Sequence, residues 1–411
     1  MRKGSGGWPV FHRIEAAQLR RFKKETDIGL RAFIFSKTGI IEEKELPAPR
    51  LDNRRAADRR AAILKPRFLS PCSSDVHTVF AGPGPRRENL ILGHEGLAEI
   101  VETGADVRDF KPGELVAVSA VMPEPGDLTG HQGVPFSGTK LGRSLDGMWA
   151  ESFRVPDADC NLAHIPEGLS MEAALMAVDM MATGYTAAEE AEISAGQTIV
   201  VIGSGAVGLM AAAAARSLTG ADGRVIMIGS DKDPYNAEMA KMFGVDIYIS
   251  YRSGRVVYAN EKQDLSAFPE RDSRANATGS AAVDAVFRVT GGYGADRVLI
   301  CGGGPEALAQ ASDLVRYGTG IVVNIAYLEG SGMAGLPIFS LGRGMSGKIF
   351  KFELSRGGRA WTEKMLAEAL KCGGLQGRLV THRLKGFDAV PEGLELMRKR
   401  PAGLIKVMVE V

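Results

Sequence analysis

The stretch TIVVIGSGAVGLM, residues 198–210, decides the fold of this 411-residue chain. A short apolar run, Thr198 to Ile202, ends in Gly203-Ser204-Gly205-Ala206-Val207-Gly208 and passes directly into a helical stretch. In a G-x-G-x-x-G turn the first glycine allows a sharp bend, the second lets the backbone approach a pyrophosphate, and the third lets helix pack on strand. Glycine-rich turns without a ligand also exist. The strand before the turn at 203–208 and the helix after it favour a dinucleotide site, because a helix N-terminus binds phosphate.

The residues that follow continue the same alternation of strands and helices. Arg224 to Ile228 is typical of a second strand, Tyr235 to Phe243 of a helix, and a third strand starts near Ile247. Strand, glycine turn, helix and strand in this order make one half of a doubly wound parallel sheet. Further parallel strands are expected at Val298 to Cys301 and Gly320 to Ile325. Residues 253–280 are polar and irregular, which predicts a surface insertion.

The N-terminal third has a different pattern, in which short apolar runs alternate with turn residues, as in a β-rich domain. These runs are Leu30 to Ile41, Ala62 to Leu69, Leu97 to Val101 and Leu115 to Val121, and Leu379 to His382 and Leu404 to Val411 resemble them. A charged, alanine-rich insertion interrupts them at 51–62. We therefore expect an α/β protein with a basic extension (1–28), a β-rich catalytic domain (29–183), a dinucleotide-binding domain (184–354) and a C-terminal return to the catalytic domain (355–411).

Composition excludes several classes of partner. A net charge of +1 argues against nucleic acid, since neutralising phosphates needs a basic excess. No apolar run approaches the ~20 residues that span a membrane. The four cysteines contain no C-x-x-C pair, which argues against a disulfide framework and against a four-cysteine zinc site. Cysteines used in this way favour a reducing compartment. A cytoplasmic protein is expected. The basic residues 1–28 leave a disordered arm, an organelle presequence and a wrongly assigned start open.

Three side chains with metal-ligand chemistry lie close together in the sequence. Cys72 stands in Pro71-Cys72-Ser73-Ser74-Asp75-Val76-His77, and His94 and Glu95 follow in Gly93-His94-Glu95-Gly96. Thiolate, imidazole and carboxylate all bind zinc, and a catalytic zinc keeps one position open. An isolated Cys or His is more often a core or surface residue, so spacing alone leaves both interpretations open.

The end of the second strand bears on the choice of cofactor. An acidic residue there binds the ribose 2′-hydroxyl and repels a 2′-phosphate. The strand ends at Gly229-Ser230, followed by Asp231 and Lys232. Asp231 pointing into the site would favour NAD, whereas Ser230, Lys232 and Tyr251 around the ribose would favour NADP. We favour NADP, with NAD as the alternative.

The chain resembles the zinc-containing medium-chain dehydrogenases, and most of all the microbial NADP-dependent secondary alcohol dehydrogenases. The stretches that carry the likeness are PCSSDVHTVF (71–80), NLILGHEGLAEIVETGADVRDFKPGELV (89–116), VDMMATG (178–184), VVIGSGAVGLM (200–210), CGGGPEAL (301–308) and LVTHRLKGFD (379–388). The likeness covers most of residues 30–411 but fails at the N-terminus and near 51–60 and 255–280. It implies a GroES-like catalytic domain beside a Rossmann domain, and a homodimer or homotetramer.

The resemblance also implies the chemistry and the residues that carry it. A single zinc would be held by Cys72, His94 and Asp179, with Glu95 as a variable fourth ligand. Zinc lowers the pKa of an alcohol, and the nicotinamide takes its hydride. In the reverse reaction zinc polarises a ketone or aldehyde, and the reduced nicotinamide donates the hydride. Ser74 and His77 would pass the proton to solvent; a helix-capping serine and a surface histidine are the alternatives.

The remaining site residues are expected around the cofactor and the substrate. The cofactor residues would be Gly203, Gly205, Ala206, Val207, Gly208, Gly229, Ser230, Asp231, Lys232, Tyr251, Gly302, Gly303, Asn324 and Tyr327. Thr139, Leu354 and Ser355 would line the substrate pocket, with Thr139 where relatives place a tryptophan. A smaller wall favours an alcohol or ketone larger than 2-propanol. A zinc-free quinone or enone reductase and a non-enzymatic relative of the same fold are the rival hypotheses.

Overall fold

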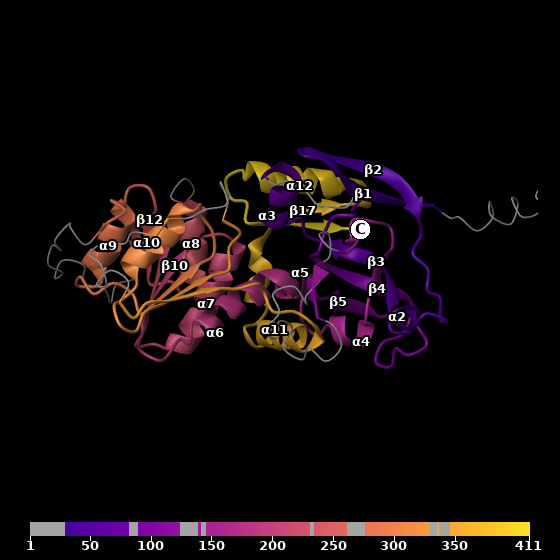
Figure 1. The fold of residues 1–411 in the computed structure, drawn as a ribbon, viewed down its shortest axis with the longest axis horizontal. Coiled ribbons are helices and arrows are strands. Elements are labelled where there is room, and N and C mark those ends of the chain that lie inside the picture. Colours follow the sequence, from indigo (N-terminus) through magenta and orange to yellow (C-terminus); the bar gives the residue numbers. More distant parts are fainter. Residues whose placement is uncertain are drawn as a thin grey trace, which may run out of the picture.

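A computed structural model describes residues 29–81, 89–123, 139–140, 145–230, 234–260, 276–328, 335–336 and 346–411. Two seven-stranded sheets organise these residues, one in each half of the molecule (Figure 1). The basic extension 1–28 lies outside the described residues. So do Asp231, Lys232 and the side chain of Thr139, so the predictions made for them are not addressed by the structure.

The sheet of the dinucleotide-binding half has the order β13-β12-β11-β10-β14-β15-β16. Its strands are β10 (Thr198–Ile202), β11 (Arg224–Gly229), β12 (Ile247–Ser250), β13 (Val256–Ala259), β14 (Arg297–Ile300), β15 (Ile321–Asn324) and β16 (Ile349–Phe352). All neighbours pair in parallel except β13, which is antiparallel to β12. Without β13 this is the 3-2-1-4-5-6 order of a Rossmann sheet. The predicted fold class is therefore confirmed.

Alternating strand residues bury the two faces of this sheet against different helices. Ile199, Val201 and Met227 share a core with α6 (Ala182–Glu190), α7 (Ala206–Thr219) and α8 (Pro234–Met242). Val200 and Ile226 share another core with α9 (Ala281–Val289) and α10 (Glu306–Leu314). Because both faces are buried, the strands are continuous apolar runs rather than alternating ones.

The catalytic half is built on a mostly antiparallel sheet that joins strands from the first half of the chain to the two C-terminal strands. Its order is β17-β18-β3-β4-β5-β9, with β8 paired to β3. The strands are β3 (Ala62–Leu69), β4 (Gly96–Thr103), β5 (Leu115–Val118), β8 (Phe153–Val155), β9 (Leu162–His164), β17 (Val380–Lys385) and β18 (Lys406–Glu410). The hairpin of β1 (Gly29–Lys37) and β2 (Ile40–Pro47) lies near α12 (Val390–Lys399) at the top of Figure 1.

Two local predictions needed correction. The insertion at 253–280 is not wholly irregular, since Val256–Ala259 forms β13, a β-prone segment that pairs with the otherwise free edge of β12. The sequence also predicts two separate helices, at Glu172–Met181 and Gly184–Ala191, but these residues form one helical stretch. A π-helical turn at Ala177–Met181 joins α5 (Met171–Met176) to α6.

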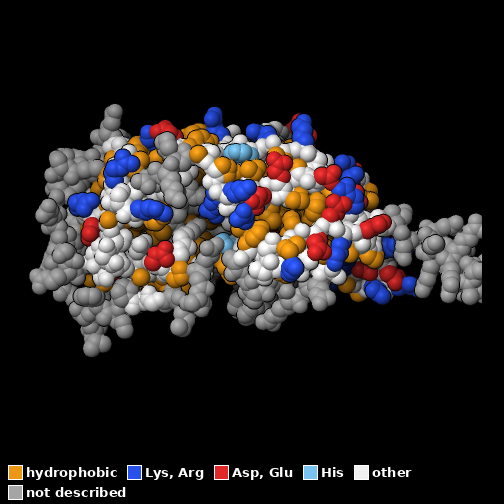
Figure 2. All heavy atoms as spheres, turned by 90° about the horizontal axis from the view of Figure 1, so that it is seen from above, with side chains coloured by type: hydrophobic (Ala, Val, Ile, Leu, Met, Phe, Trp, Pro, Cys, Tyr) orange, Lys and Arg blue, Asp and Glu red, His pale blue; other side chains and the backbone are white. Residues whose placement is uncertain are grey.

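The surface carries charges of both signs. On the face drawn in Figure 2, Lys and Arg side chains are interspersed with Asp and Glu, and no large area of one sign stands out. Such a face does not attract a polyanion by its field. In the part of the chain that the structure covers, every helix is too short or too polar to cross a membrane.

Candidate metal and dinucleotide site

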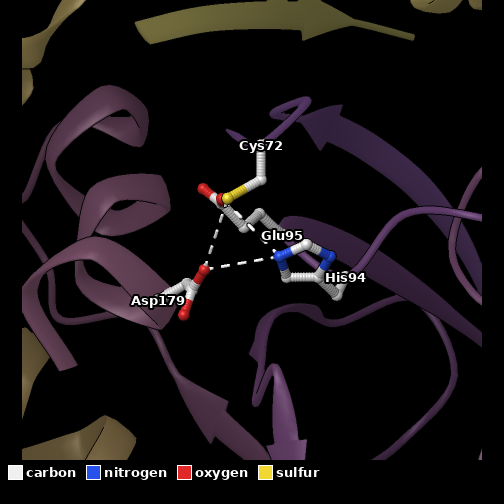
Figure 3. A group of neighbouring side chains, drawn as sticks. All are labelled: Cys72, His94, Glu95 and Asp179. Carbon is white, nitrogen blue, oxygen red and sulfur yellow. Dashed lines mark hydrogen bonds and ion pairs between the residues drawn. The ribbon is translucent and has the colours of Figure 1, made fainter. Parts of the chain in front are cut away.

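Four side chains from three distant segments meet in the catalytic half. Cys72, His94, Glu95 and Asp179 each offer one ligand atom, and these atoms all lie within 4.8 Å of one another (Figure 3). All four residues are buried. The arrangement brings together the three residues found by spacing and Asp179, which only the family resemblance indicated.

The separations suit a tetrahedral ion. The Sγ atom of Cys72 lies 3.9 Å from Oδ2 of Asp179, and Nε2 of His94 lies 3.4 Å from the same oxygen. Oε1 of Glu95 is 3.9 Å from Nε2 of His94. Bonds of about 2.0–2.3 Å to zinc place tetrahedral ligands roughly 3.3–3.8 Å apart. The donor set therefore fits zinc in both chemistry and spacing.

Local irregularities in the backbone present these ligands. Cys72 has extended backbone just before the short helix α3 (Ser73–Val76). Asp179 projects from the π-helical turn between α5 and α6, and π turns often mark functional sites. Its second oxygen, Oδ1, accepts a hydrogen bond of 3.0 Å from the hydroxyl of Thr183 one turn later. Asp179 is thus held in place and does not cap a helix.

Asp75 supports two of the ligands from behind. Its Oδ2 accepts a hydrogen bond of 2.9 Å from the backbone N–H of Cys72, and its Oδ1 lies 3.1 Å from Nδ1 of His94. With a proton on Nδ1 shared with this carboxylate, the lone pair of Nε2 is left for a metal. Asp75 therefore selects the histidine tautomer that a zinc site needs.

Replacing Asp75 by asparagine tests this support. We expect Asp75→Asn to weaken zinc binding by about 10- to 100-fold, the usual effect of losing a partner behind a metal ligand. An amide oxygen can keep one of the two hydrogen bonds but not both. Competition with a chromophoric chelator measures the affinity, and Asp106→Asn, at an exposed surface ion pair, serves as control. Equal affinities in both variants would contradict this role.

A buried lysine completes the environment. The Nζ of Lys406, in β18, lies 2.7 Å from Oε1 of Glu95 and 3.2 Å from the carbonyl oxygen of Pro71. Burial opposes the charge of this ammonium, but Glu95 and Cys72 raise the pKa of Lys406. Burial would raise the pKa of Cys72, yet Lys406 and His94 lower it to about 6. The thiolate that zinc requires is thus favoured at neutral pH.

Burial also acts on the carboxyl group of Glu95, whose pKa it raises well above the usual range while Lys406 opposes the shift. A bound dication would act in the same direction as the ammonium, since both stabilise the ionised carboxylate.

Ser74 lies beside this cluster, and His77 follows it three residues later in the chain. The hydroxyl of Ser74 is 3.1 Å from Nε2 of His94, so it faces the ligand atoms. The ring of His77 stacks on Tyr327, with ring centres 5.2 Å apart. This stack joins the π-helical turn His77–Ala81, which follows α3 in the catalytic half, to the loop after β15 in the dinucleotide half. A proton relay from Ser74 to His77 stays a prediction.

The glycine turn between β10 and α7 has the geometry expected of a dinucleotide site. Gly203 has φ +111°, and a Cβ added there would lie 2.9 Å from the backbone nitrogen of Gly302. A Cβ on Gly208 would lie 2.0 Å from the carbonyl oxygen of Gly203, so helix and strand pack too closely for any side chain. A Cβ on Gly205 would meet nothing within 4 Å, which leaves this backbone open to a ligand.

Other expected cofactor residues lie at the same edge of the sheet. Ala206 and Val207 form the first turn of α7, and Gly302 and Gly303 follow β14 next to Gly203. Asn324 ends β15, and its buried Oδ1 has no partner among the described residues. Ser230 follows β11, and its carbonyl oxygen accepts a 2.6 Å hydrogen bond from Tyr248. Tyr251 is largely exposed beyond β12.

Comparison with known proteins identifies the family. Two family models match, "Alcohol dehydrogenase GroES-like domain" over residues 58–167 and "Zinc-binding dehydrogenase" over residues 206–371. The NADP-dependent isopropanol dehydrogenase of Clostridium beijerinckii is 41% identical over 389 residues, which are 93% of this chain and 99% of that protein. The chain belongs to the zinc-dependent alcohol dehydrogenase family. The resemblance inferred from the sequence motifs is thereby confirmed.

Further relatives of this alcohol dehydrogenase family agree. The NADP-dependent isopropanol dehydrogenase of Thermoanaerobacter brockii is 36% identical over 387 residues, covering 93% of this chain and 99% of that one. Among solved structures, the zinc-dependent alcohol dehydrogenase 2 from Streptococcus pneumonia superimposes with a TM-score of 0.72 at 25% identity. That match covers 93% of this chain and 98% of the other.

Two residues expected at the substrate pocket of this alcohol dehydrogenase, Leu354 and Ser355, lie just after β16. Ser355 is buried, with its hydroxyl donating to the carbonyl oxygen of Arg356, whereas Leu354 is exposed. Arg356 pairs with Glu189 and Glu190 of α6 and anchors this segment. Their assignment to the pocket wall stays a prediction.

Sequence reasoning missed Asp75 and Lys406. Asp75 could have been found, because it lies three residues after Cys72, the spacing of a capping contact at the start of a helix. Lys406 gives no local signal. It is 311 residues from Glu95, in a strand whose other residues are mostly apolar.

Proposed function

We propose that this protein is a zinc-dependent alcohol dehydrogenase that interconverts secondary alcohols and ketones with NADP as its coenzyme. The observation that carries the proposal is the buried cluster of Cys72, His94, Glu95 and Asp179 in a chain that also has an open dinucleotide turn. Three of these residues would hold the ion, and a position would remain for an alcohol or carbonyl oxygen.

The residues around the cluster would each have a defined part. Bound zinc supplies Lewis acidity, which lowers the pKa of an alcohol or polarises a ketone, and the nicotinamide accepts or donates the hydride. Asp75 keeps Nε2 of His94 free of its proton. The hydroxyl of Ser74, which faces the ligand atoms, is placed to accept the proton of the substrate and to pass it toward His77.

The end of β11 supports NADP over NAD. Its last residue is Gly229, where an added Cβ would lie 2.3 Å from the hydroxyl oxygen of Tyr248 and 2.5 Å from Cβ of Ser204. No carboxylate side chain can therefore stand at this position to repel a 2′-phosphate. The relatives named above as NADP-dependent favour the same choice.

The other finer proposals are a cytoplasmic location and a homo-oligomer. β16 is the outer strand of its sheet, and Ile349 and Phe352 on it are exposed. Among the described residues no strand pairs with the outer side of β16, and an apolar edge of this kind is suited to pairing with a second copy of the chain. A monomeric mass in sedimentation equilibrium would exclude this interface.

An assay of both nucleotides against a graded series of alcohols tests the proposed function. We expect reduction of NADP at least tenfold more efficient than that of NAD, with secondary alcohols preferred to primary ones. If Thr139 narrows the pocket less than a tryptophan would, secondary alcohols larger than 2-propanol will have the higher kcat/KM. Turnover of ethanol and 2-propanol alone would remove the proposal of an enlarged pocket.

The main rival is a zinc-free quinone or enone reductase of the same fold. Such an enzyme has no use for three converging ligands, so the cluster argues against it. Metal analysis of the purified protein separates the two, since the proposal expects about one zinc per chain. Enone reduction by protein without metal would favour the rival.

A further inference from the structure

Lys406 is among the most deeply buried charged side chains of the described structure, with 1% of its surface exposed. Burying an ammonium is costly unless hydrogen bonds and an opposite charge compensate it. Its two acceptors are Oε1 of Glu95 and the carbonyl oxygen of Pro71, the residue before Cys72. The lysine therefore contacts one candidate ligand directly and the backbone next to another.

We propose that Lys406 is a positioning residue that competes with the zinc for Glu95 and so keeps one coordination position open to the substrate. The inference rests on the proposed zinc site. The same oxygen of Glu95 that lies 3.9 Å from Nε2 of His94 lies 2.7 Å from the ammonium. The other oxygen, Oε2, is buried with no partner in the described structure.

This arrangement gives the carboxylate two alternative uses. Held by Lys406 through Oε1, Glu95 would stay near a bound ion without serving as one of its firm ligands. In the absence of substrate the same carboxylate could bind the ion, and the hydrogen bond to the ammonium would favour its release when substrate is present. The ammonium would weaken Oε1 as a ligand, because two cations would then compete for the negative charge of the same oxygen.

Charge balance points to the same role. A thiolate at Cys72 and carboxylates at Asp179 and Glu95 carry three negative charges against the two positive charges of zinc. With the ammonium of Lys406 included, the charges of the ligands, the ion and the lysine sum to zero. Without the ammonium, the ion would be the one strong cation left beside the carboxylate of Glu95 in the described structure, so Glu95 would remain bound to it and close the open position.

The test compares Lys406→Met, Lys406→Gln, Glu95→Gln and the double variant Lys406→Met/Glu95→Gln in the full-length protein. Lys385→Met is the matched control, because Lys385 lies on the neighbouring strand β17 with an exposed side chain. One readout is the rate at which zinc passes to a chelator. The other is the alcohol concentration needed to change the visible absorption of the cobalt-substituted protein. Neither readout is enzyme turnover.

We expect Lys406→Met to release zinc about tenfold more slowly than the parent and to need about tenfold more alcohol for the spectral change. The size is at the low end of the 10- to 100-fold effects of partners behind a metal ligand, but the direction is opposite to that for Asp75→Asn because the ammonium competes with the ion instead of orienting a ligand. Removing the carboxylate in the double variant should abolish both effects. Lys406→Gln, which keeps an N–H donor but not the charge, should match Lys406→Met. Lys385→Met should match the parent.

Two results would overturn the inference. Zinc release from Lys406→Met and Lys406→Gln that is as fast as in the parent, or faster, would mean that the lysine does not compete with the metal. A double variant as impaired as Lys406→Met would mean that Lys406 acts only by supporting the fold. If Lys406→Met does not fold, Lys406→Gln decides. The absence of zinc from the parent protein would instead contradict the proposed function.

Discussion

Cys72→Ala is expected to lower kcat/KM for alcohol oxidation by at least about a thousandfold, because a Lewis-acid ion contributes several kcal/mol and each 1.4 kcal/mol is a factor of ten. Alanine removes the thiolate, the ligand that the cluster already favours by lowering the pKa of Cys72 to about 6. The imidazole of His94 and the carboxylates of Asp179 and Glu95 would remain, but an ion held by them has lost its only sulfur ligand among these four residues. Steady-state kinetics and metal analysis on the same preparation measure the effect.

A control variant can show that the expected loss of activity comes from the position of Cys72 and not from replacing a cysteine as such. Cys372 is exposed and far from the cluster in the sequence, so Cys372→Ala should keep its zinc and its activity within about twofold. Chelation of the parent protein should abolish activity, and added zinc should restore it. Full activity in thoroughly chelated protein would refute the metal mechanism.

Gly208→Val is expected to weaken NADP binding by about a hundredfold or more while leaving zinc binding unchanged. The first atom of the new side chain would lie 2.0 Å from the carbonyl oxygen of Gly203, and neither backbone group can move alone. Helix α7 must therefore shift away from β10, and its N-terminal N–H groups would no longer be placed to donate hydrogen bonds to the phosphates. Quenching of protein fluorescence by NADP measures the affinity. Each 1.4 kcal/mol of lost binding free energy raises the Kd tenfold.

Gly205→Ala separates the two roles of the glycines in this turn. An added Cβ at position 205 meets nothing within 4 Å and the backbone φ is −80°, so the protein without coenzyme should unfold at the parent's temperature. NADP binding should still weaken, because the methyl group stands where the backbone approaches the pyrophosphate. Unchanged coenzyme affinity in both variants would place the dinucleotide elsewhere.

The parts of the site that sequence predicts are those whose chemistry is local. The glycine turn follows from residues 198–210 because strand, bend and helix are contiguous there. Cys72, His94 and Glu95 are near enough in the chain for spacing to raise a metal site, although spacing cannot show that their side chains converge.

The parts that sequence does not predict depend on tertiary contacts. Asp179 looks like any acid in a helix, and only the π-helical turn and the packing of α5 and α6 direct it toward Cys72. Lys406 becomes part of the site because β18 lies beside β3. The strand β13 depended on the free edge of β12, which no local pattern reveals.

The position of β18 has a consequence for the order in which the protein folds. This strand supplies the cation seen in contact with Glu95 among the described residues, from a position 311 residues further along the chain. The buried carboxylate therefore gains its charged partner only when β18 has come to lie beside β3. Contacts between such distant residues form late compared with the contiguous turn between β10 and α7. We therefore expect refolding protein to bind the coenzyme before its candidate metal site is complete.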